Sequence, residues 1–202
     1  MRKIYKTTFI IRKIMLFTIG ELIDIVIMIV AIGYIFSTFI QRKPLSGYDP
    51  LTYYKKRPII EDIKYGAIIA APAIVLHELA HKFVAMGFGA TAVLHAPINW
   101  YIIIVIMRLL NFPLLFFVGG YVVHTPLPPL PSALVAIAGP LMNLVLFLIA
   151  RAVIKFKLVN KKYYEMITIS GRLNMFLCIF NMIPLPMFDG FHFFSQLIKF
   201  IF

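Results

Sequence analysis

The chain has 202 residues, of which 61% are hydrophobic and 14% charged, with a formal net charge of +12. This composition excludes an ordinary soluble domain, and the length excludes several domains, so we expect one membrane-embedded domain over residues 1–202. The basic excess does not indicate nucleic acid as a partner, because the cations form short clusters between apolar segments, where anionic lipid headgroups would meet them. The single cysteine, Cys178, excludes an internal disulfide and a cysteine-based metal cluster.

The N-terminal part of the chain predicts a surface flank followed by a first membrane span. Residues 1–13 are basic, and we expect them to be retained at the membrane surface. The first apolar span covers residues 18–40. Thr18 and Glu21 have the spacing of a helix capping box, and Asp24 lies one turn further on the same face. Capping and solvation explain Glu21 and Asp24 as well as a functional role does, so both interpretations stay open.

A second apolar span, residues 63–86, carries the sequence His77-Glu78-x-x-His81. On a helix the two imidazoles stand one turn apart on the same face, close enough to bind one metal ion. Two histidines on one helix can also be incidental. However, ionisable side chains in the middle of a membrane-length apolar stretch are energetically costly and usually functional, which favours a metal site.

This motif predicts hydrolytic chemistry that uses one zinc ion. Bound zinc lowers the pKa of its water from about 16 to about 7, and a carboxylate at the position of Glu78 can accept a proton as water attacks an amide carbonyl. A catalytic zinc ion usually has three protein ligands, so a third is needed beside the two histidines. The chain offers four candidates for it: His95, His124, Asp189 and His192. We favour Asp189, because an ionised carboxylate in an apolar span needs a nearby cation.

The segment between the second and third spans has a different pattern. Residues 98–117 are apolar, and the residues around Gly119 and Gly120 are β-branched and aromatic. We expect a re-entrant or short β element here, packed near the active site, because uncovered backbone is not tolerated at membrane depth. Such a strand could pair with an extended substrate. An ordinary helical hairpin is the competing interpretation.

Two further spans complete the expected fold, an all-α membrane protein with about four transmembrane helices. The third span, residues 132–154, contains Gly139-Pro140-x-x-Asn143. The side-chain amide of Asn143 needs a hydrogen-bond partner if it lies in hydrocarbon. The fourth covers residues 165–202 and is broken at 181–190 by prolines and a glycine, with Asp189 on the break. The protein is therefore expected to be a multi-pass protein of the cell membrane.

Taken together, three motifs resemble those of the site-2 protease family of intramembrane zinc metalloproteases: His77-Glu78-x-x-His81, Gly139-Pro140-x-x-Asn143 and Asn181-x-x-Pro184-x-x-x-x-Asp189-Gly190. The likeness is to a compact archaeal-type branch without added soluble domains. It implies that His77, His81 and Asp189 bind zinc and that Glu78 is the general base. It also implies that Asn143 and Asn181 order the site or hold unwound substrate. After Asp189-Gly190 the sequence departs from the pattern that the family often has. This difference bears on the recognition of substrate more than on the binding of metal.

The expected function is hydrolysis of peptide bonds in or near the transmembrane segments of membrane proteins, with those proteins and the lipid bilayer as partners. Two other classes remain open. An inactive zinc-binding scaffold would not need Glu78, and a metal transporter is disfavoured because the sequence shows no inverted repeat and one ligand cluster.

Overall fold

The computed structural model describes residues 16–37, 39, 59–110 and 119–202. The chain is mostly helical in these ranges. The α-helices are α2 (Ile19–Phe36), α4 (Ile59–Gly87), α5 (Ile98–Leu109), α6 (Pro129–Lys155), α7 (Tyr164–Asn181) and α8 (Asp189–Ile201). A short 3-10 helix, η1 (Lys161–Tyr163), precedes α7, and a small sheet contains β1 (Ala92–His95) and β2 (Tyr121–His124). The basic flank 1–13 lies outside the described residues.

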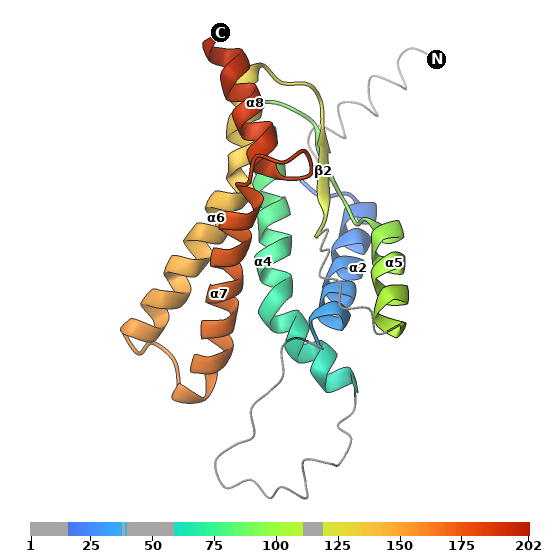
Figure 1. Ribbon diagram of the computed structural model, residues 1–202, viewed down its shortest axis with the longest axis vertical. Coiled ribbons are helices and arrows are strands. Elements are labelled where there is room, and N and C mark those ends of the chain that lie inside the picture. The colour runs from blue at the N-terminus through green and yellow to red at the C-terminus, as the bar shows by residue number, and fades with distance from the viewer. Residues whose placement is uncertain (1–15, 38, 40–58, 111–118) are drawn as a thin grey trace, which may run out of the picture.

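Helix α4 is the central element, with neighbours on both sides (Figure 1). It packs against α2 on one side and α6 on the other, while α6 also packs against α7 and α8. The sheet lies beside the C-terminal half of α4 and contacts it through both strands. As a result the polar side chains of that half, His77, Glu78, His81 and Lys82, are buried.

The packing of α2 on α4 is close because both helices have glycine at the crossing. A Cβ atom on Gly66 would lie 2.8 Å from the carbonyl oxygen of Gly33, so any side chain there would push the helices apart. The predicted capping box of α2 is confirmed. The Glu21 N–H donates to Thr18 Oγ1 at 3.2 Å, and the Thr18 N–H donates to Glu21 Oε2 at 2.8 Å.

The sheet confirms a short β element between the second and third spans, but its position differs from the expectation. β2 begins after Gly119-Gly120, and the helical alternative also holds in part, because α5 occupies much of the apolar stretch 98–117. Residues 111–118 lie outside the described part. The sequence interpretation missed β1, which pairs antiparallel with β2 in the register Leu94↔Val122 and His95↔Tyr121.

The element boundaries also differ from the predicted spans. The first helix ends at Phe36, short of residue 40. The second begins at Ile59 rather than 63, so Asp62 lies in its first turn, where a carboxylate complements the helix dipole. The third begins at Pro129, because proline is well accommodated in the first turn.

The predicted break at 181–190 is confirmed, since it separates α7 from α8. Among the described helices, α2 and α6 are long and apolar enough to cross a membrane, judged by length and composition.

Candidate metal centre

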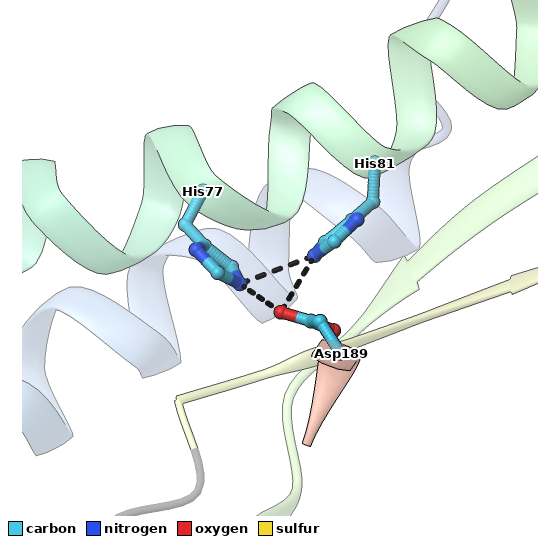
Figure 2. A group of neighbouring side chains, drawn as sticks. All are labelled: His77, His81 and Asp189. Carbon is cyan, nitrogen blue, oxygen red and sulfur yellow. Dashed lines mark hydrogen bonds and ion pairs between the residues drawn. The ribbon is translucent and has the colours of Figure 1, made fainter. Parts of the chain in front are cut away.

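Three side chains converge from two elements that are far apart in the sequence. His77 and His81 project from one face of α4, and Asp189 is the first residue of α8 (Figure 2). Asp189 Oδ2 lies 3.0 Å from His77 Nε2 and 3.4 Å from His81 Nε2, and the two Nε2 atoms are 3.1 Å apart. Ligand atoms about 2.0–2.1 Å from a tetrahedral zinc ion are roughly 3.3 Å from one another. The donor set therefore has the chemistry and the spacing of a zinc site.

Helix α6 orients both imidazoles through their other nitrogen. His77 Nδ1 is 2.9 Å from Asn143 Oδ1, and His81 Nδ1 is 2.7 Å from the carbonyl oxygen of Val135. Both partners accept, so each Nδ1 carries the proton and each Nε2 presents a lone pair toward Asp189. Asn143 is buried, and the expected partner of its amide is found for Oδ1 alone, because Nδ2 has no hydrogen-bond partner among the described residues.

A glycine of α6 leaves the space between the two imidazoles open. A Cβ atom on Gly139 would lie 2.5 Å from His77 Nε2 and closer still to His81 Nε2. No other residue type fits there without displacing the rings. The space that the glycine keeps free is therefore directly beside two of the three donor atoms, the Nε2 atoms of His77 and His81. In the sequence, Gly139 stands out only as part of a motif with Asn143, not as a residue of the site.

The loop between α7 and α8 holds Asp189 in place. The Phe188 N–H donates to the Leu185 carbonyl oxygen at 2.9 Å, which closes a turn just before Asp189. A Cβ atom on Gly190 would clash with the carbonyl oxygen of Met182, so glycine is required for the start of α8 to pack onto this loop. The break in the fourth span thus turns the carboxylate toward α4.

The other candidates for a third ligand lie elsewhere. His95 Nδ1 is 3.4 Å from Asp24 Oδ2, and His124 Nδ1 is 2.9 Å from the Thr125 carbonyl oxygen. His192 is exposed on α8. Within the described ranges, the one group of metal-binding side chains whose donor atoms all lie within 4.8 Å of one another is His77, His81 and Asp189.

A cavity of about 420 Å³ opens beside this cluster. Its polar wall contains His77, Glu78, Asp189 and Asn181, and the backbone of Gly119-Gly120 closes another side. The remaining wall is apolar and comes from Phe36, Ile74, Leu173, Phe176, Leu177, Phe180, Met187 and Phe188. The cavity is therefore suited to an apolar chain that reaches His77, Glu78 and Asp189.

The glycine pair lies directly against Glu78. A Cβ atom on Gly120 would be 2.9 Å from Glu78 Cγ and 2.8 Å from Met28 Cε, so only glycine allows this approach. The hydroxyl of Tyr101 donates to the Gly119 carbonyl oxygen and fixes the segment from α5. Tyr101 was not predicted from the sequence, because nothing in the pattern of α5 indicates which residue its hydroxyl meets.

Comparison with known proteins gives the class of the molecule. The chain is 33% identical over 178 residues to the "Putative zinc metalloprotease MJ0611" of Methanocaldococcus jannaschii, which covers 86% of this chain and 83% of that protein. It is 28% identical over 123 residues to the "Zinc metalloprotease MJ0392" of the same organism, covering 61% of this chain and 31% of that protein. No protein-family model and no solved structure matches the chain. The chain belongs to the zinc metalloprotease family that the first of these relatives represents.

Proposed function

We propose that the protein is an intramembrane zinc metalloprotease of the site-2 protease type, which hydrolyses peptide bonds in or near transmembrane segments. The observation that supports this most directly is the donor set His77, His81 and Asp189 in the wall of an apolar cavity that also contains Glu78. One zinc ion bound by those three residues would supply Lewis-acid chemistry and an acidified water.

Glu78 is the residue that moves protons in this proposal. It is buried in the cavity wall beside the histidines and is not one of the three donors, so its carboxylate is available as a base. It accepts the proton of the attacking water and delivers it to the leaving amine. Asn143 and the Val135 carbonyl keep the imidazoles in the tautomer that leaves Nε2 free.

The surface of the helices supports a location in the membrane. Large apolar side chains are exposed along the outer faces of α2 and α6: Ile19, Leu22, Ile23, Val26 and Val30 on α2, and Leu141, Val145, Leu148 and Ile149 on α6. Contiguous apolar faces of this length belong in lipid rather than in water. In the proposal α4 and α7 cross the membrane as well, giving an integral, multi-pass protein of the cell membrane.

A transmembrane substrate must be unwound before hydrolysis, since its amides are hydrogen-bonded within its own helix. The sheet offers an edge for the extended segment. The Thr125 N–H donates to the Thr91 carbonyl oxygen at 3.0 Å, and hydrogen-bonded pairs alternate along an antiparallel ladder. With the register Leu94↔Val122, the backbone groups of Val122 therefore point away from β1. A substrate strand would pair there, close to Gly119, Gly120 and Asn181.

Zinc-dependent cleavage of a membrane-spanning peptide by the purified protein tests this proposal. Glu78→Gln should keep the zinc content of the wild type and lower the cleavage rate by about 10²-fold or more, because the amide is nearly isosteric but is not a base. Glu61→Gln, an exposed position at the start of the same helix, is the matched control and should cleave normally.

Near-normal cleavage by zinc-loaded Glu78→Gln would refute the assignment of the base. Zinc binding without any cleavage by the wild type would favour the scaffold alternative. Zinc movement across a vesicle membrane would favour the transporter.

A further inference from the structure

A buried ion pair lies one residue beyond the second histidine of the site. The ammonium group of Lys82, which directly follows His81, donates to Glu21 Oε1, and each of the two side chains is only 1% exposed. The ring of Phe17 covers the ammonium group, whose nitrogen is 4.7 Å from the ring centroid. None of the proposed catalytic steps uses this pair.

The carboxylate of Glu21 joins three elements. Besides Lys82 of α4, Oε1 accepts the N–H of Leu94 in β1 at 2.9 Å. Oε2 accepts the Thr18 N–H at 2.8 Å and the Thr18 hydroxyl at 3.2 Å at the start of α2. The sequence left open whether Glu21 caps the helix or has a role near the site. The structure shows the cap and, in addition, a link between β1 and the helix that carries His77 and His81.

Stability alone is a weak reason for such a pair. Two charges lose their hydration on burial, and replacing a buried ion pair by apolar groups is often neutral or stabilising. A charged pair does, however, hold its partners in one geometry, because either charge left alone would be costly. The ion pair is therefore better explained by the geometry that it holds than by a gain in stability.

The contact with Leu94 determines which edge of the sheet remains free. Leu94 faces Val122 in a pair that does not exchange hydrogen bonds, so its N–H points away from β2. Glu21 occupies that N–H and blocks the outer edge of β1. Among the described residues, the outward N–H groups of Val122 and His124 in β2 have no such partner.

We propose that Glu21 and Lys82 are positioning residues that hold the sheet at a fixed position along the axis of α4. In this position the sheet directs an extended, apolar substrate segment to the outer edge of β2. This inference rests on the proposed function, in which that segment comes from a membrane-spanning protein. Because Lys82 is adjacent to His81, the pair sets the register between the paired substrate strand and the three donor atoms. It thereby selects the peptide bond that is cleaved.

The test uses full-length, zinc-loaded protein in detergent and a membrane-spanning peptide substrate. The double variant Glu21→Gln with Lys82→Met removes both charges and leaves neither alone. It should bind zinc as the wild type does. Loss of one oriented contact should raise KM about tenfold while kcat changes less than about threefold. Mass spectrometry of the products should show cleavage spread over neighbouring bonds instead of one principal bond.

Two further variants separate positioning from simple support. Lys82→Arg keeps the ion pair and should keep the cleavage pattern. Thr18→Ala removes the hydroxyl contacts with Glu21 Oε2 and with the Glu21 N–H, but it leaves Lys82 and Leu94 on Oε1. It should therefore lower thermal stability without moving the cleaved bond.

The outcomes that overturn the inference differ from those that overturn the proposed function. A double variant with the KM and the single cleaved bond of the wild type refutes positioning while proteolysis stands. Loss of zinc in proportion to lost activity also refutes it, since the pair would then only support α4. A wild-type protein that does not cleave the peptide refutes both.

Discussion

At the scale of single residues, the three donor atoms of the site need a cation. Both imidazoles donate from Nδ1, so the lone pairs of two Nε2 atoms 3.1 Å apart face the carboxylate oxygen of Asp189. Three acceptors at this distance repel one another in a buried setting, and a metal ion or a proton among them removes the repulsion. Replacing one of these acceptors should therefore change the amount of metal bound, which tests the identity of the third ligand.

Asp189→Ala should remove most of the bound zinc, whereas His192→Ala should retain it. Asp189 contributes one of three ligand atoms, and even residues behind the ligands of a metal usually change its affinity about 10- to 100-fold. Zinc content of the purified variants, measured by elemental analysis, checks this. The reverse pattern would make His192 the ligand.

Gly139→Ala should likewise reduce zinc binding, by at least about tenfold, because its methyl group would lie between the two imidazoles. Gly87→Ala is the matched control, since a Cβ atom at Gly87 meets nothing within 4 Å. Both variants should be made and inserted normally. Full zinc occupancy in Gly139→Ala would show that the rings move aside and that the space is not reserved for the ion.

The sequence predicted residues whose chemistry or spacing is local and missed those that depend on another element. His77, Glu78 and His81 follow from helical spacing, and Asp189 follows from the cost of a lone carboxylate. The contact of Lys82 with Glu21 spans 61 residues and depends on how α2 approaches α4. No periodicity within either helix contains that information.

At the scale of elements, the small sheet is short, and the glycine pair just before its second strand lines the cavity. Its second strand was anticipated from β-branched residues around a glycine pair. Its first strand was not, because Ala92–His95 is too short to show a clear alternation. The core face of the sheet includes Leu94, which is buried, while Tyr121 and Val123 are exposed on the other face.

Val122→Pro should lower cleavage of a membrane-spanning substrate about tenfold with zinc content unchanged, because proline removes an outward N–H from the free edge of β2. Val122→Ala keeps that N–H and loses only side-chain packing, so it should retain most of the activity. Equal rates for the proline and alanine variants would show that the substrate does not pair with this edge.

At the scale of the whole molecule, composition predicts a membrane protein, and two described helices are long and apolar enough to cross a membrane, whereas the number of spans stays a prediction. α2 and α6 meet a simple test of length and apolarity, because their polar residues are few. α4 carries Lys64, His77, Glu78, His81 and Lys82 within its length. The last four are buried between neighbouring helices, so hydropathy underestimates how apolar the outer surface of α4 is.

Removal of the metal should destabilise the whole molecule, since the site ties α4 to α8 and is oriented by α6. A ligand that binds only the folded state at 100 times its Kd stabilises it by about 2.7 kcal/mol. For a chain of this size, that corresponds to a Tm lowered by roughly 5–10 °C when a chelator removes zinc. Glu78→Gln should show the same shift as the wild type, because Glu78 is not among the donors. Asp189→Ala should show almost none, and a chelator-induced shift of wild-type size in Asp189→Ala would mean that the stabilising metal is bound somewhere else.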